Sequence, residues 1–214
     1  TADNNTAIGY FSMADNSTGA TNTAIGKNSL RLHTTGSLQT ALGNETLYNA
    51  TTGNSNTAVG EAAGYNVTTG DDNLLVGRDA GRAGYSPFGV TTQDNRLVMG
   101  NDNITNAYVQ VAWTVTSDQR DKTNFGEVPH GLDFVNKLKP VSFQFRKSRE
   151  NDTPHGPMHY GFKAQDILAL EGDNNVIIDN EELHKLKYKG EHLVPVLVNA
   201  IKELTKRIKD LEDK

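Results

Sequence analysis

Hydrophobic residues in the first half of the chain recur in a short, fixed pattern. The segment Asn5-Thr6-Ala7-Ile8-Gly9 returns in closely similar form, and its last glycine recurs at positions 9, 26, 43, 60 and 77, a period of 17 residues. Thr-Gly pairs ending at positions 19, 36, 53 and 70 keep the same step. An irregular sixth copy, 95–100, follows a looser segment that contains Pro87. Self-similarity at a fixed period indicates a repeat architecture.

Each repeat predicts one coil of a parallel β-solenoid. The β-branched residues before the first glycine favour a short strand, while glycine and asparagine permit tight turns. We expect a turn at that glycine, a second short extended piece, and another turn at Thr-Gly. Each coil has few apolar side chains. At roughly 25 cal/mol per Å2 of apolar area buried, they contribute little free energy against the entropic cost of ordering the coil. We therefore expect several chains to wind together.

The pattern changes in the second half and predicts a small α+β domain. Apolar residues there alternate in one segment and follow helical spacing in others. The predicted elements are a helix over 132–138 ended by Pro140, a strand over 141–145, a charged, proline-flanked loop over 147–157, a helix over 164–170 stopped at Gly172, and a short buried strand over 176–178.

A helix is expected from about Glu191 to the end, with Pro195 in its first turn, where the missing N–H costs little. Its apolar residues step by three and four, as in a heptad repeat: Val194, Leu197, Ile201, Leu204, Ile208 and Leu211. Two interpretations follow. The helix packs on its own domain, or it forms a short coiled coil with other chains.

Composition excludes several classes of function. The net charge is −5 without a basic run, so no nucleic-acid partner is expected, and no apolar stretch approaches the 18 residues of a membrane span. The chain has no cysteine, which excludes disulfides and thiolate zinc sites. His155 and His159 flank the predicted loop without a third ligand at suitable spacing, so we expect no metal and no cofactor. Because Thr1 lies within a repeat, we expect the sequence to be a fragment.

The junction between the two halves carries the candidate chemistry, the polar segment 117–122. Ser117 precedes Lys122 by five positions, and a serine hydroxyl becomes a nucleophile when a neighbouring base takes its proton. Lysine serves as that base only when neutral, which requires desolvation or nearby positive charge. In an unrelated sequence, Ser117 would be a helix N-cap or turn residue beside Asp118. Trp113 and Tyr160 are expected to be core or interface aromatics.

The chain from Ser117 to its end resembles the S74 peptidase family, the intramolecular chaperones at the C-termini of phage tail fibres, tailspikes and endosialidases, found also in myelin regulatory factors. Four segments in order carry the resemblance: Ser117-Asp118-x-Arg120-x-Lys122, Leu138-Lys139-Pro140-Val141-Ser142-Phe143, Gly161-Phe162-x-Ala164-Gln165-Asp166, and Leu193-Val194-Pro195 with Ala200-Ile201-Lys202-Glu203-Leu204. The repeats separately resemble the NTAIG-type motifs of trimeric adhesin heads and phage fibres, and this resemblance implies a β-roll or an intertwined β-helix.

The resemblance implies a chaperone that assembles three chains, sets the register of a β-structured shaft, and then releases itself. It assigns Ser117 as nucleophile, Lys122 as general base and Thr116–Ser117 as the scissile bond. Arg120 would lower the proton affinity of Lys122. Asp118 would orient Lys122 or remain merely solvated. Cutting would occur once per chain.

The expected organisation is a shaft region over 1–116 (repeats 1–85, irregular transition 86–116), a chaperone domain over 117–190 and the helix over 191–214. Expected partners are two further copies, upstream fibre domains and a host-cell receptor bound through the shaft. The chain would fold in the host cytoplasm and end in a virion tail fibre. One alternative is a fibre tip that does not cleave and keeps this domain as a trimeric foot. A second, a membrane-tethered transcription factor of the myelin regulatory type, is disfavoured because the repeats lack a basic DNA-contacting stretch.

Overall fold

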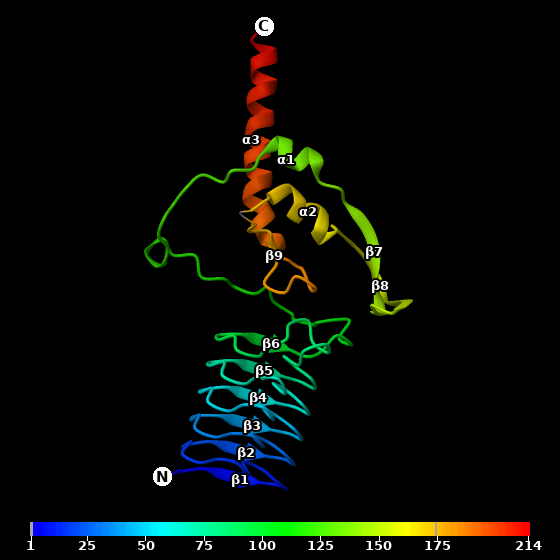
Figure 1. Ribbon diagram of the computed structural model, residues 1–214. Coiled ribbons are helices and arrows are strands. Elements are labelled where there is room, and N and C mark those ends of the chain that lie inside the picture. Colours follow the sequence, from blue (N-terminus) through cyan, green and yellow to red (C-terminus); the bar gives the residue numbers. More distant parts are fainter. Residues whose placement is uncertain (1, 174) are drawn as a thin grey trace. The chain divides into compact units, whose positions relative to one another are not determined.

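The computed structural model describes residues 2–173 and 175–214. The chain divides into two compact units, Thr1–Ala107 and Tyr108–Lys214. The first unit is a parallel β-solenoid, and the second is a small α+β region that ends in a long helix (Figure 1). The fold class expected from the sequence is confirmed.

The solenoid contributes one three-residue strand per coil to a parallel sheet in which each strand pairs with the next in the chain. Equivalent residues of successive repeats face one another, as in the pair of Ala24 and Ala41. The sequence distance from the fifth coil to the sixth is longer than one repeat, because the segment with Pro87 lies between them. The strands are β1 (Thr6–Ile8), β2 (Thr23–Ile25), β3 (Thr40–Leu42), β4 (Thr57–Val59), β5 (Leu74–Val76) and β6 (Leu97–Met99).

The solenoid core is a narrow column of small and medium side chains. The middle residue of each strand from β2 to β6 points inward and is buried, as Ala41 and Leu75 illustrate. Only one strand forms in each coil: the chain turns after the first glycine, and the predicted second extended piece around the Thr-Gly pair forms no strand. Leu30 and Leu47 lie in those turns with φ of 49° and are fully buried. A coil that closes within one repeat needs these left-handed residues to reverse direction and fill the core.

A ladder of buried amide side chains joins the coils, which the apolar pattern did not reveal. The Asn56 side chain accepts a hydrogen bond from the backbone N–H of Asn73 at 3.0 Å and donates to the Gly70 carbonyl at 2.8 Å. The same two contacts recur at the equivalent residue of every coil from the first to the fifth: Asn5, Asn22, Gln39, Asn56 and Asn73. Buried polar groups must be paired, so this ladder fixes the stacking register.

The recurring first glycine is required by both conformation and space. Gly43 has φ of 139°, and a Cβ on it would lie 2.7 Å from the carbonyl oxygen of Gly60 in the next coil. Any other residue would push neighbouring coils apart. The 17-residue spacing of these glycines is therefore a packing constraint of the stack.

The second unit contains these elements: η1 (Gln119–Asp121), α1 (Leu132–Lys137), β7 (Val141–Ser148), β8 (Asn151–Gly161), α2 (Ala164–Glu171), β9 (Ile178–Asp179), β10 (Lys187–Tyr188), η2 (Gly190–His192) and α3 (Leu193–Glu212). Both short helices lie where the sequence predicted them, and Gly172 caps α2 with φ of 68°. Their core comprises Phe134, Ile167, Ile177, Ile178, Leu193 and Val196.

The prediction of a loop over 147–157 is wrong. Most of this segment belongs to β8, which forms an antiparallel hairpin with β7. Pro154 pairs opposite Arg146, and Pro157 lies further along the same strand. Among the described residues β8 pairs with β7 alone, and prolines are confined to such edge strands because a nitrogen that faces the free edge removes no ladder bond. Two register shifts accommodate the remaining mismatch.

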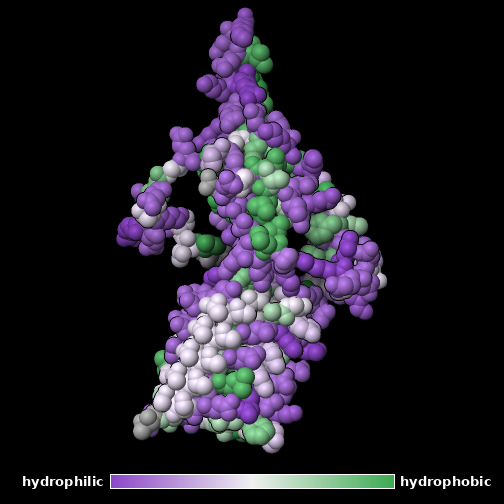
Figure 2. Space-filling model, in the orientation of Figure 1, coloured by the Kyte–Doolittle hydropathy of each residue, from purple (hydrophilic) through white to green (hydrophobic). Residues whose placement is uncertain are grey.

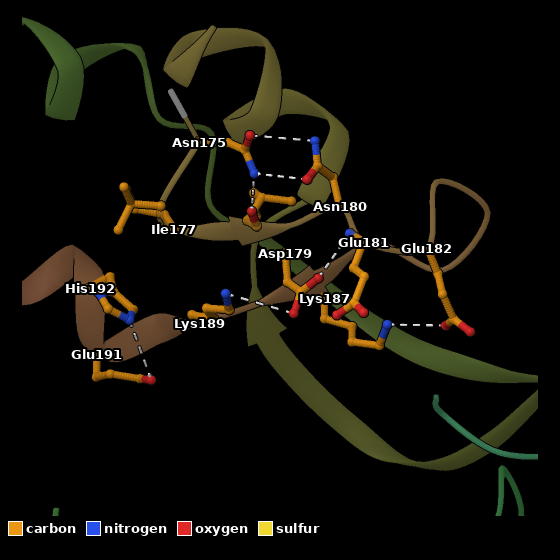
Figure 3. Close-up of polar contacts among 12 residues, drawn as sticks. Asn175, Ile177, Asp179, Asn180, Glu181, Glu182, Lys187, Lys189, Glu191 and His192 are labelled. Atoms are coloured by element: carbon orange, nitrogen blue, oxygen red, sulfur yellow. Dashed lines mark hydrogen bonds and ion pairs between the residues drawn. The ribbon is translucent and has the colours of Figure 1, made fainter. Parts of the chain in front are cut away.

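Polar contacts hold the segment between α2 and α3 in place. Glu171, at the end of α2, accepts backbone hydrogen bonds from Val176, Ile177 and Ile178 at 2.7, 2.7 and 3.0 Å. Farther along, Asn175 donates to the Ile178 carbonyl, and Lys189 lies 3.7 Å from the Asp179 carboxylate (Figure 3). The predicted strand over 176–178 is thereby shortened, since only Ile178 of it enters β9.

Helix α3 uses two different faces. Leu193, Val196 and Ala200 are buried against the unit, as the first interpretation of the helix required. The heptad residues lie on another face and remain exposed, and hydrophobic side chains gather along α3 (Figure 2). Packing on its own domain therefore leaves the apolar stripe of α3 free: Val194, Leu197, Ile201, Leu204, Ile208 and Leu211.

Candidate active site

A short 3-10 turn brings Ser117 and Lys122 together. The turn is η1, closed by a hydrogen bond from the Lys122 backbone N–H to the Gln119 carbonyl at 3.2 Å. It reverses the chain, so that the Lys122 Nζ donates to the Ser117 Oγ at 2.6 Å. A five-residue spacing thus places an amine beside a hydroxyl.

The capping role that the sequence allowed for Ser117 belongs to Asp118. The Asp118 Oδ1 accepts from the backbone N–H of Arg120 at 2.9 Å, which caps the turn. The same carboxylate binds the Arg120 guanidinium, with Nη2 to Oδ2 at 2.6 Å. The guanidinium lowers the pKa of Asp118 and the carboxylate raises that of Arg120. The charge of Arg120 is therefore compensated within the turn, and the Ser117 hydroxyl is left free to face Lys122.

The peptide bond before Ser117 is accessible. Thr116, Ser117 and Lys122 are all exposed in the single chain. This exposure leaves the Lys122 amine in contact with water in the single chain.

Two residues of α3 anchor the chain downstream of the turn, a role that sequence reasoning missed. Asn199 donates to the carbonyls of Val128 and His130 at 3.2 and 3.3 Å. Glu203 accepts from the Leu132 backbone N–H at 3.1 Å. These partners lie about seventy positions away in sequence, and no local pattern signals them. Helix α3 therefore holds the segment that follows the candidate dyad.

The remaining candidate residues lie away from this turn. His155 and His159 lie on β8, where they pair opposite Phe145 and Phe143. Within residues 2–173 and 175–214, no group of three or more His, Asp or Glu side chains is placed to hold a metal ion. Tyr160 and Trp113 are exposed in the single chain, so neither is a core aromatic there, and the expectation that they lie at an interface stays a prediction.

The fold and this turn define a class of protein, a β-solenoid chain with a serine–lysine pair at the start of a small α+β unit. Residues 117–176 match the model of the Peptidase S74 family, described as chaperone of endosialidase. The match begins at Ser117 itself. The chain therefore carries a Peptidase S74 domain behind a solenoid of 17-residue repeats, as the sequence resemblance predicted. This domain implies an intramolecular chaperone with an autocleavage role in fibre-like proteins.

No curated protein and no solved structure gives a significant match to the chain. In the part of the chain that the structure describes, no helix combines the length and apolarity needed to cross a bilayer.

Proposed function

We propose that residues 117–214 trimerise the chain, set the register of the solenoid, and then release themselves by cutting the Thr116–Ser117 bond. The observation that supports this most directly is the 2.6 Å contact between Lys122 Nζ and Ser117 Oγ, at the first residue of the family match. Cleavage there would separate the repeats from the chaperone. The proposed partners are two further copies, upstream fibre domains and a host-cell receptor bound through the repeats, in a virion fibre assembled in the host cytoplasm.

The chemistry proceeds in two steps. Neutral Lys122 takes the proton of the Ser117 hydroxyl, and the oxygen attacks the carbonyl carbon of Thr116. The C–N bond breaks, the proton passes to the released α-amine, and the Thr116 acyl group is left as an ester on Ser117. Water then hydrolyses the ester and yields the Thr116 carboxylate and the free hydroxyl. The shaft fragment departs, so each chain reacts once.

Assembly supplies the condition for the first step. The lysine must lose its proton before it can accept one from Ser117, and removal of water favours the neutral amine. In the single chain Asp118 binds Arg120 and compensates its charge, so the proposal does not rely on Arg120. Desolvation by neighbouring copies is the remaining route, and the exposed turn offers them a surface to cover. Cutting would then follow correct trimer formation.

Intact mass over time tests the dyad. The parent chain should yield two fragments divided between Thr116 and Ser117, while Ser117→Ala and Lys122→Ala should stay whole. Lys122→Arg is the sharper variant, because arginine keeps the charge and donors but stays protonated. It should also stay uncut. Lys139→Ala, at another exposed lysine, should cleave like the parent.

An uncut parent that is trimeric by light scattering would remove the peptidase proposal. It would leave the alternative function, a fibre tip in which this unit stays attached as a trimeric foot.

A further inference from the structure

The segment immediately before the candidate scissile bond is a strand sequence without a strand partner. Residues 108–116 adopt no helix or sheet, and none of these described residues makes a backbone hydrogen bond within the chain. Its apolar side chains are 55–80 % exposed: Val109, Val111, Trp113 and Val115.

The composition of this segment favours sheet over loop. Apolar residues occupy every second position from 109 to 115, the period that places them on one face of a strand. They are β-branched or aromatic, the residue types enriched in strands. The segment contains neither glycine nor proline, the residues that usually break strands or form loops. An exposed strand sequence of this kind pairs when an edge is offered to it.

The identical segment of another copy is the partner that fits. Residues 108–116 carry no charge, so parallel in-register pairing sets no like charges opposite each other. The same chain already stacks equivalent residues in register through its solenoid. The apolar stripe of α3 (residues 194–211) is a second unpartnered surface with the heptad spacing of parallel self-association. An exposed apolar surface with heptad spacing thus lies on the same unit as the unpaired segment.

We propose that residues 108–116 of three copies pair as β-strands, with Val109, Val111, Trp113 and Val115 facing the common axis. One consequence rests on the proposed cleavage. After the cut, the segment becomes the new C-terminus of the shaft. The stripe on α3 leaves with the released unit. The paired strands then keep the three shaft ends together.

A cysteine scan on the full chain tests the pairing, because the protein has no cysteine of its own. Single cysteines are placed at 109, 111 and 115 and, as matched controls, at 110, 112 and 114, in a Ser117→Ala background. Mild oxidation should give disulfide-linked dimers in several-fold higher yield at the odd positions. Each variant is first shown to be trimeric by light scattering.

Trp113 provides an independent readout, since it is the single tryptophan. Its fluorescence emission maximum should lie at shorter wavelength in the assembled chain. The maximum should shift to longer wavelength when dilution dissociates the assembly. Trimers with equal or no cross-linking at all six positions would overturn the pairing and leave the chaperone proposal standing. A monomeric chain would overturn both. Alternating cross-links in a chain that never cuts would support the pairing and remove the peptidase.

Discussion

At the scale of single residues, His33 is a titratable group buried in the solenoid. Its side chain is fully buried, and its Nε2 lies 2.7 Å from the Gly36 carbonyl. Burial lowers the pKa of His33, against the opposing effect of the nearby backbone of Gly36 and Ala50. The folded coil therefore favours the neutral imidazole. The previous coil places Asn16 at the equivalent position, where its amide donates to Gly19 at 3.0 Å.

This environment predicts acid-sensitive stability. Above about pH 6.5, the ordinary pKa of histidine, His33 is neutral in both states and its contribution is complete. As the pH falls below that value, the unfolded chain binds a proton more readily than the folded one, so stability declines. His33→Asn should lose this component. Thermal unfolding midpoints from pH 8 to 5 should therefore fall more steeply for the parent than for the variant. Parallel curves would contradict the assignment to His33.

At the scale of elements, the amide ladder stabilises the solenoid where its apolar core is thin. Asn56→Ala removes the acceptor for the Asn73 backbone and the donor to Gly70, leaving buried partners unpaired. The expected cost is about 2–6 kcal/mol, the sum for two unsatisfied buried groups. Denaturant unfolding measures it.

The neighbouring coil supplies the control for this substitution. Gln39 occupies the equivalent rung, so Asn56→Gln should recover most of the loss. An alanine variant as stable as the parent would show that the ladder is not required for stacking.

At the scale of the whole molecule, the apolar stripe of α3 links assembly to cleavage. Ile201→Glu together with Ile208→Glu would bury unpaired carboxylates in any helix–helix contact, at about 3 kcal/mol or more per chain. Under the proposed function the trimer should dissociate and the cut at Thr116–Ser117 should be lost with it. Light scattering and intact mass, measured on the same samples, test both.

Lys202→Glu with Lys209→Glu has the same seven-residue spacing one position along the helix, outside the stripe. It should leave assembly and cutting intact. Cleavage by a monomeric stripe variant would show that cutting needs no assembly.

The sequence alone determined the features that depend on neighbours along the chain. The 17-residue repeat required coils in register, and Gly172 ended α2, because both are set by local backbone geometry. The sequence singled out Ser117 and Lys122, and the tight turn between them places their side chains in contact. Local spacing also identified the apolar stripe on α3.

Only the tertiary structure decided what depends on distant partners. β8 was hidden by Pro154 and Pro157, which are acceptable in an edge strand. Asn199 reaches Val128 across the fold, and no periodicity records such a contact. The buried face of α3, with Leu193 and Val196, likewise emerged only when the helix packed on its unit. Local propensity reports the shape of a segment, whereas burial and hydrogen-bond partners are properties of the folded chain.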